Sequence, residues 1–291
     1  MEANANKAPA PSLRRRKKPI NWVFLTGCLI VGFMCVVAAF PSLFTDYSPT
    51  AQDPFAMFAA PGAEHWFGTD NFRRDIFARV VYATRIDLAI GIGAMIVPCV
   101  LGSLLGLFAG YYGGWLDNLI MRILDISMAF PFMVLAIIVA AIIGHGVEIL
   151  LISSWLVGWR EYARLIRAEV LVQKNSEYIQ SAISMGYSNN RIIFRHILPN
   201  VISSALVYAA SDVVICMMSA ASLSFLGLGV QAPTPEWGAI ISDGKAFLGT
   251  AWWITVIPGL DHRDPRPGTG LHRLGLQHDR RRSVRYAACP R

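Results

Sequence analysis

The sequence predicts an all-α fold, a polytopic transmembrane helical bundle, and two observations carry this prediction. Only 15% of the 291 residues are charged and 54% are hydrophobic, whereas a soluble domain carries about 25% charged residues. Several runs of 18 or more residues are almost free of charge, and about 20 apolar residues suffice to cross a bilayer. Because backbone groups in lipid must be hydrogen-bonded internally, these runs are expected to be helices.

Six apolar runs predict six spans. They comprise residues 20–40, 88–112, 126–143, 147–159, 201–230 and 251–260. Pro131 interrupts the third run, and the fourth is expected to continue helically into the loop that follows. The last run has ten residues, too few to cross alone, so we expect the sixth span to be disrupted. The first run is too long for a signal-peptide core of about 7–15 residues and is interpreted as a retained span.

The basic residues predict the orientation of the chain. If the N-terminus is cytoplasmic, thirteen Lys and Arg fall on the inner side and five on the outer side, as the positive-inside rule expects. Residues 1–19 are then a cytoplasmic basic tail, residues 41–85 an extracytoplasmic segment, and residues 86–260 the main transmembrane domain.

The composition changes abruptly after Leu260. Residues 261–291 hold eight Arg and three His and no apolar run. We interpret this segment as the product of a frameshift; the alternative is a basic cytoplasmic tail after a damaged span. The cysteines have no spacing that suits a metal, so no metal site is expected, and the placement of the positive charge argues against nucleic-acid binding.

The loop at residues 160–199 is the main candidate for function, since 40 residues exceed a passive connection. Ile179, Ala182, Ile183 and Gly186 share one face of a predicted helix. A turn and a second helix follow. Pro199 either ends this second helix or opens the fifth span. We expect the apolar face to point away from the membrane, and an exposed apolar patch is typical of a partner site.

Two polar residues in or near the fifth span are candidates for a functional role. Asp212 lies within the apolar run, where a charge is costly and often faces a translocation path; a hydrogen bond to a neighbouring helix is as good an explanation. His196 is expected to make hydrogen bonds at the foot of the span. Gly102, Gly106 and Gly110, four residues apart, predict close helix packing, in the bundle rather than in a dimer.

The loop resembles the EAA loop of ABC importer permeases, although Gln180 and Ser181 stand where that family has Glu and Ala. In the family this loop is a coupling helix that sits in a cleft of the ATP-binding subunit. The resemblance therefore implies that the ATPase-coupling residues are Gln180, Ser181, Ala182, Gly186, His196, Leu198 and Pro199.

Other stretches are similar to the C-type permease subunit of dipeptide and oligopeptide importers, a type shared by nickel and glutathione importers. These are HWFGTDNFRRD (65–75), YYGGWLD (111–117), SMAFPF (127–132) and SLSFLGLGVQAPTPEW (222–237). Two positions depart from the family: Arg73 replaces a usual Gly, and Ala220 replaces an acidic residue.

The resemblance implies a type I permease fold in a bacterial inner membrane. It also implies four partners besides lipid: a homologous permease, two ATP-binding subunits and an extracytoplasmic solute-binding protein. ATP would be used by the partner, and this chain would bind no cofactor. Its substrate would be a di- or oligopeptide or a related small solute.

Absent motifs define the alternatives. The chain lacks G-x-x-x-x-G-K-[ST], HExxH and G-x-S-x-G, so neither ATP binding nor an intramembrane enzyme is expected. The alternative to an ABC permease is a secondary transporter or channel subunit, which predicts paired intramembrane charges or inverted repeats.

Overall fold

The structure is a computed structural model that describes residues 22–260, and the regular elements in that range are helices. In chain order they are α1 (Trp22–Ala39), η1 (Pro41–Leu43), α2 (Ile76–Tyr112), α3 (Gly114–Met128), α4 (Phe132–Ile143), α5 (Val147–Lys174), α6 (Glu177–Ser184), α7 (Asn189–Arg191), η2 (Ile192–Ile197), α8 (Leu198–Phe225), α9 (Trp237–Gly244), η3 (Lys245–Phe247) and α10 (Trp253–Leu260). The segment η2 is a π-helix.

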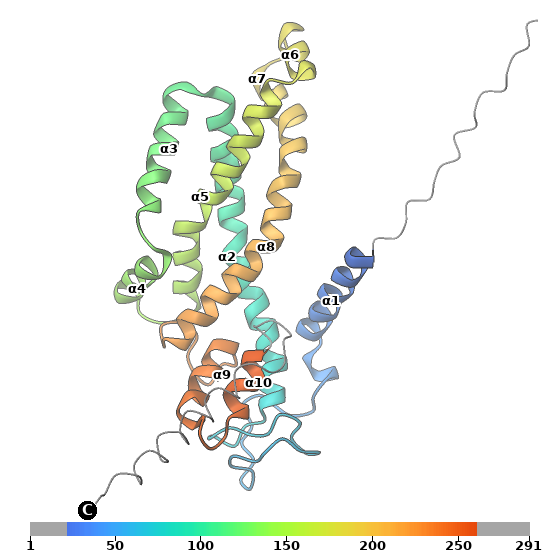
Figure 1. Cartoon of the computed structure of the whole chain (residues 1–291), viewed down its shortest axis with the longest axis vertical. Helices are drawn as coiled ribbons and strands as arrows, with labels where there is room; N and C mark the ends of the chain where they lie inside the picture. Colours follow the sequence, from blue (N-terminus) through green and yellow to red (C-terminus); the bar gives the residue numbers. More distant parts are fainter. Residues whose placement is uncertain (1–21, 261–291) are drawn as a thin grey trace, which may run out of the picture.

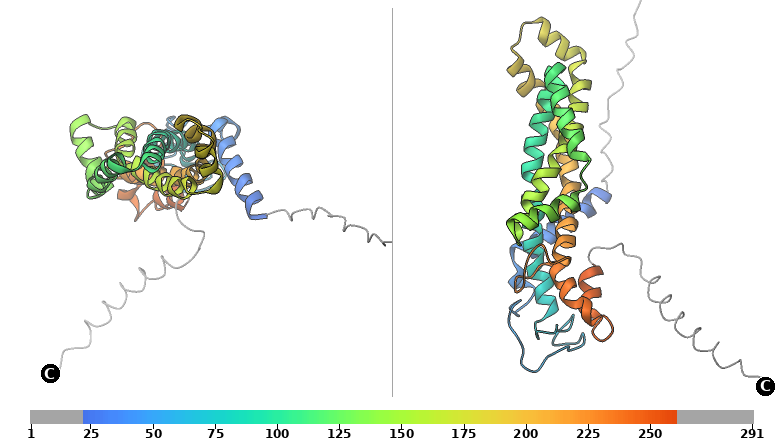
Figure 2. Two further views of the ribbon diagram at one scale, coloured as in Figure 1. Left: turned by 90° about the horizontal axis from the view of Figure 1, so that it is seen from above. Right: turned by 90° about the vertical axis from the view of Figure 1, so that its left-hand side faces the viewer.

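Three long helices, α2, α5 and α8, run along the length of an elongated bundle and pack against one another (Figure 1). One end carries α6 and α7. The opposite end carries α9, α10 and the irregular segment that precedes α2, as Figure 1 and the right-hand view of Figure 2 show. We call the three long helices α2, α5 and α8 together the shaft. The two groups of shorter elements lie at its opposite ends.

Glycines set the close contact between α2 and α5. A Cβ atom on Gly102 would lie 2.3 Å from the carbonyl oxygen of Trp159, and one on Gly106 would lie 2.4 Å from that of Ala163. The third glycine, Gly110, faces Val170 in the same way. The prediction that these glycines serve packing within the bundle is confirmed.

The long helix α2 begins at Ile76, ten residues before the predicted boundary at residue 86. Its N-cap is Asp75, whose carboxylate accepts a hydrogen bond from the amide of Ala78. The hydropathy pattern missed this first part because Arg79 and Asp87 interrupt it. Both are buried and have polar partners in the fold.

The apolar run at residues 126–143 is divided between α3 and α4, whose axes differ by 82°. The break falls at Ala129–Pro131, as the proline predicted, but the helix before it starts at Gly114 rather than Ile126. By length and composition, residues 76–112 and 189–225 are long enough to span a membrane, and the bent pair is a third candidate. The helix α1 is apolar but shorter, and α5 continues helically to Lys174 as predicted.

The last described helix, α10, packs against α9. It has eight residues, a length of about 12 Å, which does not cross a bilayer. The fifth run ends as a helix at Phe225, five residues before its predicted end. The interpretation of residues 261–291 as a frameshift product lies outside the described residues.

Candidate functional site

The loop between α5 and α8 forms the predicted helix–turn–helix at one end of the bundle (Figure 1). The short helix α6 starts after a turn at Asn175 and Ser176, and the hydroxyl of Ser176 donates to the carbonyl of Gln173 at 2.6 Å. The second part of the motif, α7 and η2, leads directly into α8, so the loop and this span form one continuous helical rod from Asn189 to Phe225.

Gly186 ends α6. Its φ of +76° lies in the left-handed region, where a residue with a Cβ is strained. The amide of Gly186 donates to the carbonyl of Ile183 at 2.9 Å, and that of Tyr187 to the carbonyl of Ala182 at 3.2 Å. This pair of bonds is the Schellman motif, so the glycine stops the helix and reverses the chain.

The apolar face of α6 points the opposite way from the prediction. Ile179 and Ala182 are buried and pack against α5, η2 and α8 in one apolar cluster. The face exposed at the end of the molecule carries Tyr178, Gln180, Ser181, Ile183 and Met185. The prediction of an outward groove of small residues is therefore wrong, because the end of the bundle itself covers that groove.

The other predicted coupling residues are spread over the base of the loop. His196 is half-buried, its ring stacks on that of Tyr187 at 5.9 Å, and its Nε2 is buried without a hydrogen-bond partner among the described residues. The expected hydrogen bonding at the foot of the span is found at the backbone instead, where the carbonyl of His196 accepts from Asn200 Nδ2 at 2.8 Å. Leu198 begins α8, and Pro199 is its second residue, directly after the π-helix η2.

Asp212 lies within α8 and is buried. The hydroxyl of Tyr162, on α5, donates to its Oδ2 at 2.9 Å. Of the two explanations that the sequence left open, the structure provides the hydrogen bond to a neighbouring helix.

Buried charges hold the opposite end of the bundle together, and no sequence motif identified them as a site. The carboxylate of Asp70 accepts from Arg74 Nε and Arg79 NH1, each at 2.7 Å. The same arginines reach Asp243 of α9 at 3.3 and 3.4 Å. We call Asp70, Arg74, Arg79 and Asp243 the charge network; it joins the segment before α2 to α9.

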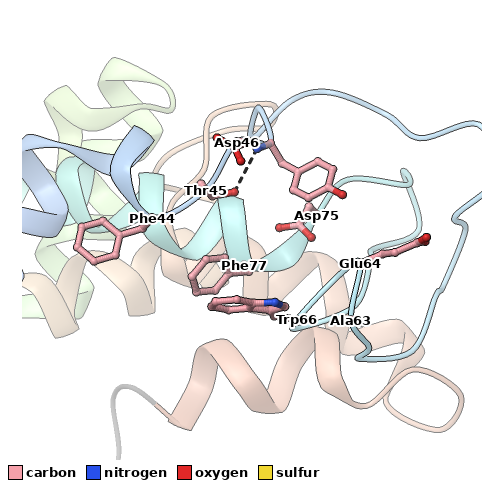
Figure 3. A pocket seen from close by; sticks show the side chains of 9 residues that line it. Phe44, Thr45, Asp46, Ala63, Glu64, Trp66, Asp75 and Phe77 are labelled. Atoms are coloured by element: carbon pink, nitrogen blue, oxygen red, sulfur yellow. Dashed lines mark hydrogen bonds between the residues drawn. The ribbon is translucent and has the colours of Figure 1, made fainter.

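A cavity of about 270 Å³ lies at the same end of the molecule, between the start of α2 and the segment before it (Figure 3). Its wall combines the aromatic rings of Trp66 and Phe77 with the carboxylates of Asp46, Glu64 and Asp75. Asp75 is already engaged, since His65 Nδ1 lies 2.8 Å from its Oδ2.

A long apolar helical bundle with an exposed helix–turn–helix at one end is typical of a polytopic helical membrane protein. The chain belongs to the family described as binding-protein-dependent transport system inner membrane component, whose model matches residues 102–260. It is therefore the permease subunit of an ABC importer in the inner membrane.

Two relatives illustrate the similarity. The dipeptide transport system permease protein DppC of Alkalihalophilus pseudofirmus is 42% identical over 239 residues, which cover 82% of this chain and 79% of the relative. The glutathione transport system permease protein GsiD of Escherichia coli O6:K15:H31 is 43% identical, over 81% of this chain and 78% of the relative.

The fold is also found in a solved structure. An inward-facing crystal form of the MetNI methionine ABC transporter aligns with a TM-score of 0.52 at 16% identity, covering 72% of this chain and 96% of that chain. At this identity the likeness concerns the fold alone.

Proposed function

We propose that this permease subunit docks a separate ATP-hydrolysing subunit through the outer face of α6 and moves a short peptide across the membrane. The observation that supports the docking is the exposure of α6 at the end of the shaft. Ile183 is 42% exposed and Met185 64% exposed, whereas Ile179 and Ala182 of the same segment rest on a buried apolar cluster.

The assembly would contain a homologous permease, two ATP-binding subunits and an extracytoplasmic binding protein. The N-terminus would be cytoplasmic, which places α6 on the side where ATP is available. Closure of the ATPases would displace α6, and the shaft would carry that displacement to the opposite end.

Substitution of the exposed face tests the docking. Met185→Glu introduces a charge at an apolar contact and should abolish co-purification of the ATPase. Val172→Glu is the control, since Val172 is an exposed apolar residue of the neighbouring helix α5; it should leave the complex intact. Retention of the ATPase by Met185→Glu, or equal loss in both variants, would contradict a contact centred on α6.

The substrate is inferred from the two relatives, whose names specify dipeptide and glutathione transport. Both solutes contain a peptide bond and a free carboxylate. Uptake of a labelled dipeptide and of glutathione by proteoliposomes that hold the full complex tests this inference. Transport without ATP or without the ATPase would instead support a secondary transporter or channel.

Asp212 remains a candidate for the translocation path. The Asp212→Asn variant keeps an acceptor for Tyr162 but removes the charge. A path role predicts reduced transport from a stably folded complex, whereas a packing role predicts transport that follows the amount of folded protein.

A further inference from the structure

The last turn of α2 lies directly beneath the coupling loop. Tyr111, the penultimate residue of α2, is 6% exposed and belongs to the same apolar cluster as Ile179 and Ala182 of α6. The helix ends one residue later, and Gly113 and Gly114 follow with φ of +65° and +61°. Because L-residues with a Cβ rarely adopt this conformation, these glycines fix where α2 stops.

One residue, Tyr111, contacts both sequence flanks of α6. Its hydroxyl donates to Asn189 Oδ1 at 2.9 Å, and Asn189 is the first residue after the turn that follows α6. Its carbonyl accepts from Lys174 Nζ at 2.6 Å, and Lys174 is the last residue of α5, just before α6. The Lys174 ammonium also lies 5.5 Å from the centre of the Tyr111 ring.

These contacts suit the end of a helix. The last four carbonyls of an α-helix have no partner within it, and a lysine near this end also interacts favourably with the helix dipole. Lys174 is also joined to α6 itself, because Gln180 Nε2 donates to the carbonyl of Lys174 at 2.9 Å. A displacement of α6 therefore strains bonds that end on α2.

We propose that Tyr111 is a positioning residue that ties the end of α2 to both flanks of α6, so that movement of α6 reaches α2 as well as α8. This inference rests on the proposed docking of an ATPase on α6. Its consequence is that the Tyr111–Asn189 bond affects the coupling of ATP hydrolysis to transport more than it affects the folding of the chain.

The test compares two adjacent tyrosines in the full transporter. Tyr111→Phe keeps the ring but removes the hydroxyl that donates a hydrogen bond to Asn189. We expect the ratio of substrate transported to ATP hydrolysed to fall about threefold to tenfold, the effect of one lost hydrogen bond. Tyr112→Phe is the matched control: Tyr112 is 49% exposed, its hydroxyl has no hydrogen bond among residues 22–260, and the ratio should not change.

Variants of the partner separate coupling from folding. Asn189→Asp keeps an acceptor and should preserve the ratio, whereas Asn189→Leu should lower it as Tyr111→Phe does. The double variant Tyr111→Phe/Asn189→Leu should be no worse than either single change.

A normal ratio in Tyr111→Phe, or an equal fall in Tyr112→Phe, would overturn the inference. Failure of the wild-type chain to hold an ATPase would instead overturn the proposed function, so the two failures are distinguishable.

Discussion

The two ends of the shaft are built from different interactions. At the loop end, α6 rests on an apolar cluster. Single hydrogen bonds join it and its flanks to their surroundings: Gln180 donates to the carbonyl of Lys174, Asn200 donates to the hydroxyl of Tyr178, and Tyr111 donates to Asn189. At the opposite end, the charge network shares two carboxylates between two buried arginines.

The difference shows which end is able to move. Apolar contacts are non-directional, so a helix that rests on them is able to shift at small cost. Buried ion pairs depend on good geometry, and removal of one partner costs about 3–5 kcal/mol. We therefore expect the loop end to carry the motion and the charge network to hold the other end together.

The largest expected effect is at the charge network. Asp70→Asn leaves Arg74 and Arg79 without their closest counter-charge and should lower the free energy of unfolding by about 3–5 kcal/mol. Thermal unfolding of the purified protein in detergent measures this. The control is Asp46→Asn, an exposed carboxylate, for which a change within about 0.5 kcal/mol is expected. Equal stability of the two variants would remove the contrast between the ends.

A single methyl group added between the helices of the shaft should lower the free energy of unfolding. In Gly106→Ala the new Cβ would lie 2.4 Å from a backbone oxygen, and backbone cannot turn aside, so a loss of about 1–3 kcal/mol is expected. Gly32→Ala on α1 has open space around it and should be neutral or stabilising. An unchanged free energy of unfolding for Gly106→Ala in the same assay would contradict this prediction, because it would mean that α2 and α5 move apart at this contact without cost.

The turn after α6 should show a smaller effect. Gly186→Ala meets no neighbouring atom, so its cost is the strain of a left-handed residue, about 1–2 kcal/mol. Asn tolerates this conformation better, and Gly186→Asn should retain more of the co-purified ATPase than Gly186→Ala. The reverse order would show that side-chain volume at this position, rather than backbone conformation, matters.

The smallest effect should be a gain of stability. Arg73 has a φ of +64°, a left-handed conformation that suits the glycine which the resemblance to C-type permeases implies at this position. Arg73→Gly relieves a strain of about 1–2 kcal/mol and adds a chain-entropy cost of about 0.5–1 kcal/mol. A rise in unfolding temperature is expected for Arg73→Gly, and none for Arg73→Ala, which keeps the strain.

The apolar runs predicted the central part of α2 and most of α8. They failed at the start of α2, because Arg79 is buried there with partners that hydropathy does not show: Asp70 lies nine residues before it, and Asp243 lies 164 residues away. Hydropathy along the chain contains no information about such pairs.

The coupling loop shows a different limit. Periodicity predicted that Ile179, Ala182, Ile183 and Gly186 share a face of α6; this is confirmed for Ile179 and Ala182, which are both buried, and is wrong for Ile183 and Gly186, which are exposed. It could not give the direction of the face, because this depends on whether an apolar surface is available beneath the helix. Tyr111 and the isoleucines of η2 provide that surface, and spacing along the sequence does not show that they lie beneath α6.

The π-helix η2 has a consequence for the evolution of the loop. A π turn closes its hydrogen bonds over five residues instead of four, so it accommodates one extra residue without breaking the helical rod. Ile192–Ile197 is therefore the place where homologous chains should differ in length by one residue. Alignments of related permeases should show such single-residue insertions or deletions there, with the length of α8 itself preserved.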